Sequence, residues 1–334
     1  MAAKGRVLVT GASGFLGRRL VEMLVARGHA VRALVRKTSK LDGLQLPGVE
    51  IACGDIADAA DLKQAFDGLD YVVHAAADTS GTEAGARRVT IGGTRNILDL
   101  CVDMKVKRLV YISSCSVYGV AGCHPGQVLD ETAKIEPFPE RRGLYTWGKQ
   151  EAEKLVLESM RLGLVSAVCL RPGTIYGCGG ENYTPMIGFS LKKKLFIVFT
   201  NDELVLPLVY VDNLVEAILV AMTSARGSGQ VYNVVDPLGV NKKQYIDLLI
   251  RRLYRGVPVV YLPYGLLEYV VAVQERLFYL FKCRPILSQY RLDSSQKPIV
   301  YDSSRLVDEL EWQPRMKFAE AVEVILASQS GGCD

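Results

Sequence analysis

The stretch Val7-Leu8-Val9-Thr10-Gly11-Ala12-Ser13-Gly14-Phe15-Leu16-Gly17 decides the fold, because an apolar strand runs in it directly into three glycines spaced three apart. In this pattern Gly11 allows a tight turn, Gly14 lets the backbone approach a pyrophosphate, and Gly17 lets the next helix pack close to the strand. The simpler explanation is a strand-to-helix turn that only needs glycine. The position at the start of a βαβ unit favours a dinucleotide site instead. The expected phosphate contacts are Gly11, Ser13, Gly14, Phe15, Leu16 and Gly17.

The sequence around this motif alternates short apolar runs with longer amphipathic segments, which predicts parallel strands covered by helices. The expected strands are Arg6–Thr10, Ala30–Val35, Val49–Cys53, Tyr71–His74, Arg108–Ser113 and Ser166–Leu170. The expected helices are Gly17–Arg27, Asp58–Phe66, Gly92–Met104 and Tyr145–Arg161. The fold class is therefore α/β, with a Rossmann-type doubly wound parallel sheet.

The alternation loosens beyond Tyr176, where a smaller, discontinuous and mostly helical substrate-binding cap is expected. Here the sequence predicts a helix over Pro185–Lys194, a strand end running into a helix over Val209–Met222, and a strand over Gln230–Val235. Residues from Asp236 to about Phe281 are expected to be mostly helical. The resulting division assigns 1–175 and 207–235 to the dinucleotide-binding domain, and 176–206 and 236–330 to the cap.

Composition excludes several classes of protein. The 334 residues are 49% hydrophobic and 23% charged, as in ordinary globular proteins, and the net charge of +4 is too small and too dispersed for a nucleic-acid-binding surface. The eight cysteines form no C-x-x-C pair, and the chain opens without an apolar signal stretch. We therefore expect free thiols, no metal site, no nucleic-acid partner and a cytoplasmic location.

The most hydrophobic segment is Leu262–Phe281, which is nearly long enough to span a bilayer. The residues Glu268, Gln274, Glu275 and Arg276 interrupt it, and each central charge costs about 2.5 to 3.5 kcal/mol on insertion. A transmembrane helix is therefore not expected. An amphipathic helix that closes the cap is favoured over a helix lying on a membrane surface.

The end of the second strand bears on the choice of cofactor. Nineteen residues after Gly17 the chain reads Arg36-Lys37, where an NAD-selective site usually carries an acidic residue. These cations suit the 2′-phosphate of NADP(H), so NADP(H) is favoured and NAD(H) remains possible; a solvated basic turn is the simpler alternative. Asp55, followed by Ile56, is a candidate contact for the adenine amino group, or else a helix N-cap.

Hydroxyl groups gather where the fifth strand ends, at Ser113 and Ser114, and Tyr145 follows with Lys149 four residues later. Residues four apart share one face of a helix, so Tyr145 and Lys149 should point into the same site. A nearby ammonium group and an oxidised nicotinamide would lower the pKa of a tyrosine, which could then exchange a proton with an alcohol. Ser114 would orient the substrate oxygen.

With these motifs the chain resembles the extended branch of the short-chain dehydrogenase/reductase superfamily over almost its whole length. The matching segments are Gly11–Gly17, Asp55, His74–Ala77, Ser113–Ser114, Val117–Gly119, Tyr145–Lys149 and Arg171–Gly177. One departure is Thr90, which stands where the superfamily commonly has asparagine.

The resemblance implies a catalytic role for Ser114, Tyr145 and Lys149, with Lys149 also holding the nicotinamide ribose. It further implies that Ala75, Ala76 and Ala77 line the cofactor, that Pro172, Gly173 and Thr174 lie beside the nicotinamide, and that Ser113, Tyr145 and Lys149 contact the cofactor. A homodimer through the helices at Gly92–Met104 and Tyr145–Arg161 is implied as well.

Two substrate classes compete. Nucleotide-sugar epimerases and dehydratases typically carry an arginine just before a Val-x-Asp segment, whereas this chain has no cation between Glu203 and Asp212. Lys192–Lys194 or Arg291 could substitute for that arginine. The Tyr210-Val-Asp-Asn213 form and the apolar 262–281 segment are more similar to 3β-hydroxysteroid dehydrogenases. The sequence thus favours hydride transfer to or from a lipophilic alcohol or ketone, over a nucleotide-sugar enzyme and over a non-catalytic dinucleotide sensor or scaffold.

Overall fold

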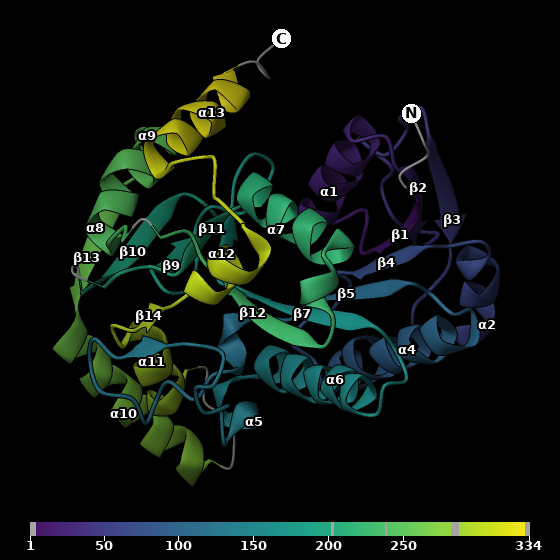
Figure 1. The fold of residues 1–334 in the computed structure, drawn as a ribbon. Coiled ribbons are helices and arrows are strands. Elements are labelled where there is room, and N and C mark those ends of the chain that lie inside the picture. Colours follow the sequence, from purple (N-terminus) through teal and green to yellow (C-terminus); the bar gives the residue numbers. More distant parts are fainter. Residues whose placement is uncertain (1–4, 202–203, 238, 282–286, 331–334) are drawn as a thin grey trace.

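A seven-stranded parallel sheet forms the centre of the computed structural model, which describes residues 5–201, 204–237, 239–281 and 287–330 (Figure 1). The strand order is β12-β7-β5-β4-β1-β2-β3, which confirms the doubly wound fold. The strands are β1 (Arg6–Thr10), β2 (Ala30–Val35), β3 (Val49–Cys53), β4 (Tyr71–His74), β5 (Arg108–Ile112), β7 (Ala167–Pro172) and β12 (Gln230–Val234). The order reverses between β1 and β4, and such a switch point is where ligands bind in this class of fold.

Two helical layers cover the sheet, and alternate residues of each strand face opposite layers. In β1, Val7 and Val9 pack with one layer and Leu8 with the other. The first layer holds α1 (Phe15–Ala26), α7 (Val211–Thr223) and α12 (Ser304–Leu310). The second holds α2 (Ala59–Leu62), a 3₁₀ turn (Lys63–Phe66), α4 (Gly93–Asp103) and α6 (Leu144–Arg161). The predicted strands and helices of this part match the structure to within a few residues, except that a π-helical segment (Ala86–Gly92) precedes α4.

A second, smaller sheet with the order β13-β10-β9 lies beside the first, on the left in Figure 1. Its strands are β9 (Gly188–Leu191), β10 (Leu195–Thr200) and β13 (Val259–Pro263). The helices around it are α8 (Lys242–Tyr245), a π-helical turn (Ile246–Ile250), α9 (Arg251–Leu253), α10 (Tyr264–Leu280), α11 (Gln289–Gln296) and α13 (Phe318–Ser330). The remaining short elements are α3 (Glu83–Gly85), 3₁₀ turns (Cys115–Val117, Ala225–Gly227), β6 (Val128–Leu129), α5 (Pro139–Arg142), β8 (Thr174–Tyr176), β11 (Leu208–Tyr210) and β14 (Val300–Tyr301).

One prediction for the cap is wrong. The expected helix over Pro185–Lys194 is instead the start of a hairpin, because the run Leu195–Thr200 is aromatic and β-branched and pairs with β9. The prediction of a mostly helical stretch after Asp236 is confirmed, although the stretch also contains the strand β13, which pairs in parallel with β10. The predicted strand and helix around Val209 are confirmed as β11 and α7.

The helix expected within 262–281 is confirmed as α10, but only Leu267 and Val271 of this helix are buried. Most of its other large apolar side chains, among them Leu266, Val270 and Leu277, face solvent instead of closing the cap. Among the described helices, none is both long and apolar enough to cross a membrane. Six cysteines are free thiols, as expected, namely Cys53, Cys101, Cys115, Cys123, Cys169 and Cys178; Cys283 and Cys333 lie outside the described residues.

Candidate active site

The glycine motif forms a turn into which no side chain could fit. Gly11 has a φ of +69°, and a Cβ atom on Gly17 would lie 2.1 Å from the carbonyl oxygen of Gly11. Gly14 is the N-cap of α1 and no side chain caps this helix. The N-terminus of α1 therefore presents backbone N–H groups and the positive end of the helix dipole, a structure that suits a pyrophosphate. Ser13, Phe15 and Leu16 are partly buried around this turn.

A buried polar chain joins the ends of β1 and β4, on either side of the switch point. The Thr10 hydroxyl lies 2.7 Å from Nδ1 of His74, whose Nε2 lies 3.0 Å from the Thr94 hydroxyl. The backbone N–H of Ala76 also donates to Thr10. Burial, helped by the charge of Lys149, lowers the pKa of His74 to about 3, so the imidazole stays neutral. These hydrogen bonds hold the segment Ala75–Ala77 next to the glycine turn.

Thr90 has a structural function that its sequence position did not reveal. Its hydroxyl accepts a 2.9 Å hydrogen bond from the backbone N–H of Asp78, and its carbonyl accepts one from Thr94. Thr90 also packs against α6 at Gly148. Because this glycine has no side chain, the side chain of Thr90 fits against the helix. A threonine at this position thus connects the segment after β4 to the helix that carries Tyr145 and Lys149.

The groups expected at the adenine end lie after β2 and β3. Arg36 and Lys37 are exposed at the end of β2, which leaves their charged ends accessible to an anion. Asp55 accepts hydrogen bonds from the N–H of Ala57 and, at 2.6 Å, from Arg88. The N-cap of α2 is Asp58, so the alternative function considered for Asp55 is wrong. Ile56 is buried and packs on α4. It lies so close to Gly93 that a Cβ atom on this glycine would be only 2.6 Å from the Ile56 side chain.

Ser114 and Tyr145 come together in the structure. Ser114 caps a short 3₁₀ turn, and its Oγ accepts a 3.1 Å hydrogen bond from the N–H of Ser116. The Ser114 side chain lies close enough to the Tyr145 hydroxyl to influence its pKa. Tyr145 is 40% exposed as a residue, but desolvation of its hydroxyl end raises its pKa, and the contact with Ser114 opposes that shift. The protein's own groups therefore keep Tyr145 protonated at neutral pH.

Lys149 lies one turn further along α6 and is buried. Its Nζ donates a 2.6 Å hydrogen bond to the carbonyl of Ile112 at the end of β5, and it lies 5.2 Å from the centre of the Tyr111 ring. Burial lowers the pKa of Lys149 to about 8, against the opposing effects of Cys169 and Glu153. This ammonium group is thus held at the carboxyl edge of the sheet with little solvation.

A cavity of about 1030 Å³ opens beside Ser114 and Tyr145. The predicted nicotinamide-end residues Pro172, Gly173 and Thr174 line it from the sheet side. A Cβ on Gly173 would lie 2.2 Å from the carbonyl oxygen of Pro207, so this glycine allows the close approach of two chain segments. The opposite wall comes from the cap and from the 140s segment, with the apolar residues Leu144, Met186, Phe189, Phe199, Val205 and Leu292 and the cations Arg141, Arg142 and Arg291.

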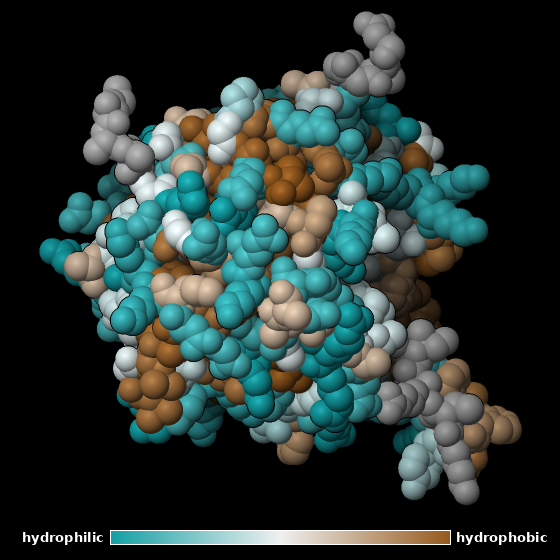
Figure 2. Space-filling model, turned by 90° about the vertical axis from the view of Figure 1, so that its right-hand side faces the viewer, coloured by the Kyte–Doolittle hydropathy of each residue, from teal (hydrophilic) through white to brown (hydrophobic). Residues whose placement is uncertain are grey.

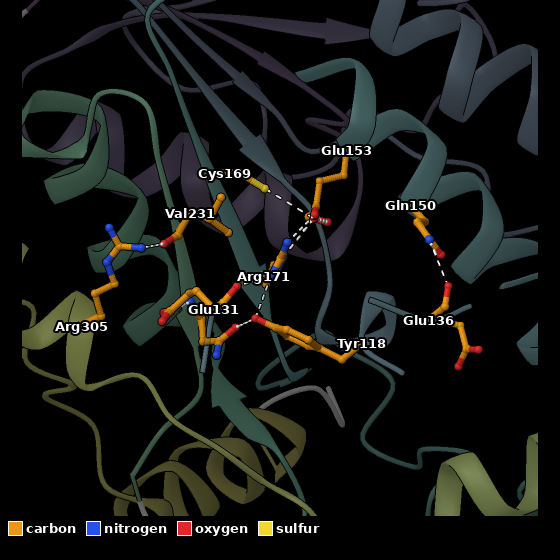
Figure 3. A network of polar contacts seen from close by, with 11 residues as sticks. Tyr118, Glu131, Glu136, Gln150, Glu153, Cys169, Arg171, Val231 and Arg305 are labelled. Atoms are coloured by element: carbon orange, nitrogen blue, oxygen red, sulfur yellow. Dashed lines mark hydrogen bonds and ion pairs between the residues drawn. The ribbon is translucent and has the colours of Figure 1, made fainter. Parts of the chain in front are cut away.

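The hydroxyl of Ser113 points away from this cavity and donates to Glu153. Glu153 also forms a buried 2.6 Å ion pair with Arg171, which in turn donates to Tyr118 (Figure 3). Burial disfavours the charge on Arg171, but the bonds to Glu153 outweigh it and raise the pKa of Arg171. This network joins α6, the end of β5 and β7, one helical turn along α6 from Lys149. Sequence reasoning missed it, although Glu153 follows Lys149 by four residues and so lies on the same helix face.

The chain is similar in sequence and in fold to several known proteins. Residues 7–234 match the NAD dependent epimerase/dehydratase family. The chain is 33% identical to the 4-hydroxy-2-methyl-3-oxo-4-farnesyl-3,4-dihydroquinoline-1-oxide ketoreductase of Stigmatella aurantiaca, over 73% of this chain and 72% of the relative. It is 30% identical to the 3 beta-hydroxysteroid dehydrogenase/Delta 5-->4-isomerase of Mycobacterium tuberculosis H37Rv, over 83% and 77%. The crystal structure of gox2253 superimposes with a TM-score of 0.80 at 26% identity, covering 98% of each chain.

Proposed function

The chain belongs to the NAD dependent epimerase/dehydratase family and is an enzyme of the extended short-chain dehydrogenase/reductase type, and we propose that it transfers a hydride between a nicotinamide cofactor and a lipophilic secondary alcohol or ketone. The observation that carries this proposal is the cavity that Ser114 and Tyr145 share with Pro172–Thr174. A carbonyl group there lies within reach of both hydroxyls and next to the expected nicotinamide position.

The chemistry assigned to the protein's residues is acid–base catalysis. A bound reduced nicotinamide supplies the hydride. Tyr145, which stays protonated in the free protein, donates its hydroxyl proton to the substrate oxygen as the carbonyl is reduced. Ser114 donates a hydrogen bond to the same oxygen and so orients it. Lys149 stabilises the resulting tyrosinate by its charge and, by the superfamily resemblance, holds the nicotinamide ribose.

The residues present fit a dinucleotide, because no side chain caps the N-terminus of α1 and its N-cap Gly14 is exposed, so the backbone N–H groups there stay accessible to a pyrophosphate. NADP(H) is proposed as the preferred form over NAD(H). Arg36 and Lys37 are both exposed where a 2′-phosphate would lie, and neither has an acidic neighbour in Val35–Lys40. A guanidinium group can bind phosphate oxygens through two charge-assisted bonds.

The substrate class is supported by the walls of the cavity. The residues contributed by β9, β10 and the segments around them are mainly apolar, which suits a lipophilic ring system or chain. The ketoreductase and steroid dehydrogenase relatives act, by their names, on lipophilic compounds. The second candidate is a nucleotide-sugar substrate, favoured by the cations Arg141 and Arg291 in the same cavity. Arg142, another cation of the cavity wall, already donates a hydrogen bond to the carbonyl of Tyr118.

Thermal-shift and turnover measurements distinguish these candidates. The purified protein with NADPH is screened against sterol ketones, aryl ketones and UDP- or TDP-sugars, because a ligand at a hundred times its Kd stabilises by about 2.7 kcal/mol. NADPH oxidation with a lipophilic ketone supports the proposal. Stabilisation and turnover by UDP-sugars alone would establish the second candidate. Cofactor binding without turnover of any class would leave a dinucleotide sensor or scaffold.

The organisation proposed for the chain follows from the same assignment. Residues 1–175 and 207–235 hold the cofactor, and 176–206 and 236–330 hold the substrate. A homodimer through α4 and α6 is proposed from the superfamily resemblance. Sedimentation-velocity measurements test it, since a single species at the mass of one 36.7 kDa chain would contradict it.

A further inference from the structure

Helix α10 is amphipathic, but its apolar face points to solvent and not to the protein core. Its outer face carries Leu266, Val270, Val273, Leu277 and Leu280 at spacings of four, three, four and three residues, which place them in one stripe. These five side chains are between 37% and 73% exposed. A surface helix normally turns such a stripe towards the core.

Two polar side chains of α10, Gln274 and Glu275, face the protein instead. The Gln274 amide donates a 2.7 Å hydrogen bond to the carbonyl of Leu287, and the Glu275 carboxylate accepts one from the N–H of Gln289. The apolar contacts on this inner side come from Leu267 and Val271, which pack with Phe199, and from the partly buried Tyr264. The orientation of α10 is thus fixed by polar contacts on its inner side and leaves its apolar stripe uncovered.

The apolar surface continues onto the small sheet. Phe189, Ile197 and Val260 stand side by side in neighbouring strands and so share one face. Phe189 and Val260 are 43% and 51% exposed, and Leu191, two residues along β9, is 53% exposed. We call this surface, together with the stripe on α10, the apolar face. The opposite side of the molecule, around β3 and α2, is mainly hydrophilic with hydrophobic side chains in small groups (Figure 2). A continuous apolar face of this kind marks an interaction site.

Cations surround the apolar face. Lys192–Lys194 form the β9–β10 turn, Arg255 lies on the segment that precedes β13, and Arg276 lies on α10; all are exposed. The strands β9, β10 and β13 contain no acidic residue, and the two glutamates of α10 are not exposed. Lys192 and Lys193 have φ values of 51° and 57°, at turn positions that favour asparagine and glycine. Lysine is therefore present there at a conformational cost.

We propose that the apolar face docks on the surface of an anionic lipid bilayer, with α10 lying in the plane of the interface. An apolar helix face that carries Tyr269 and Tyr279, beside basic residues, has the chemistry that interfacial helices use. A second copy fits less well, because a two-fold pairing of this face would bring its cations against the same cations. A spanning helix is excluded for α10 by its 17 residues and its charges.

Docking would also bring the substrate cavity close to the lipid. Phe189 and Glu275, which belong to β9 and α10, line the cavity as well. A lipophilic substrate could then enter from the bilayer without crossing water. This consequence rests on the proposed function, whereas docking itself does not.

The test is co-sedimentation of the full chain with vesicles of POPC alone and of POPC with POPG, without substrate. The first variant combines Val270→Ser, Val273→Ser and Leu277→Ser. The control combines Val128→Ser, Val307→Ser and Val324→Ser, which are exposed valines elsewhere on the surface. Wild type and control are expected to bind vesicles that contain POPG. The α10 variant is expected to bind them at least about tenfold more weakly. A second variant, Lys192→Glu with Lys193→Glu, is expected to lose the preference for POPG, and added salt to weaken binding of the wild type.

Wild type that remains in the supernatant with POPG vesicles would overturn the proposal, as would equal binding by the α10 variant and the control. A dimer that the α10 substitutions dissociate in sedimentation velocity, without vesicle binding, would assign the face to a second copy. Thermal unfolding of each variant shows that it is folded, since all the substituted side chains are exposed. If the wild type bound vesicles that contain POPG but reduced no lipophilic ketone, the proposed function would be contradicted and the docking proposal would stand.

Discussion

Replacing Lys149 by methionine should change the stability of the protein by an amount that depends on pH. The Lys149 side chain is buried, and burial lowers its pKa from 10.5 to about 8. The unfolded chain therefore binds more protons than the folded protein between these two values, so the wild type gains stability as pH rises through this window. Methionine has a similar length and no charge, so Lys149→Met removes both the penalty and its pH dependence.

The magnitude follows from the shift in pKa. At about 1.4 kcal/mol per unit, the shift costs the wild type about 3 kcal/mol at neutral pH, and about 2 kcal/mol of this is recovered between about pH 7 and pH 9.5. Loss of the hydrogen bond to Ile112 costs the variant about 1 to 3 kcal/mol at both pH values. The difference in stability between variant and wild type should thus change by about 2 kcal/mol in favour of the wild type as pH rises.

Urea unfolding of both proteins at the two pH values, without cofactor, measures this change. Other groups that titrate are common to the two proteins and cancel in the difference. The reasoning would be refuted if the stability difference were the same at both pH values, because Lys149 would then have an ordinary pKa in the folded state. The variant should also lose turnover, which would show that the charge is kept for catalysis at the expense of stability.

Three further perturbations test other parts of the structure. Gly17→Ala places a Cβ 2.1 Å from a backbone oxygen, so urea unfolding should show a loss of about 1 to 3 kcal/mol, and Gly122→Ala, in open space, should show almost none; equal stabilities would contradict the close packing. Glu153→Gln leaves the buried charge of Arg171 unpaired and should cost about 3 to 5 kcal/mol in the same assay; a loss below about 1 kcal/mol would show that the pair is solvated. Arg36→Ala should raise the Kd of NADP about tenfold in a fluorescence titration and leave the Kd of NAD nearly unchanged; equal effects on the two cofactors would refute the 2′-phosphate assignment.

The sheet and the catalytic helix could be predicted because their signals are local. Buried parallel strands such as Arg108–Ile112 are continuous apolar runs, and the spacing of Tyr145 and Lys149 shows directly that they share a helix face. The glycine turn is similarly determined by residues close together in the sequence.

The cap was predicted poorly because its elements depend on distant partners. The strand β10 pairs with β13, about sixty residues further along the chain, and no local pattern shows that pairing. The amphipathic pattern of 262–281 predicts a helix but not which side faces the protein; the bonds of Gln274 and Glu275 decide that. The pair of Glu153 with Arg171 likewise depends on the packing of α6 against β7.

The turnover of Tyr145→Phe tests the central claim most directly, because this change removes one hydroxyl from the cavity and leaves the ring. Single-turnover oxidation of NADPH by a ketone substrate should slow by about a hundredfold or more. The Kd of the cofactor, measured in the same preparation, should stay within about twofold. A variant that binds cofactor normally and reduces the ketone as fast as the wild type would contradict the account.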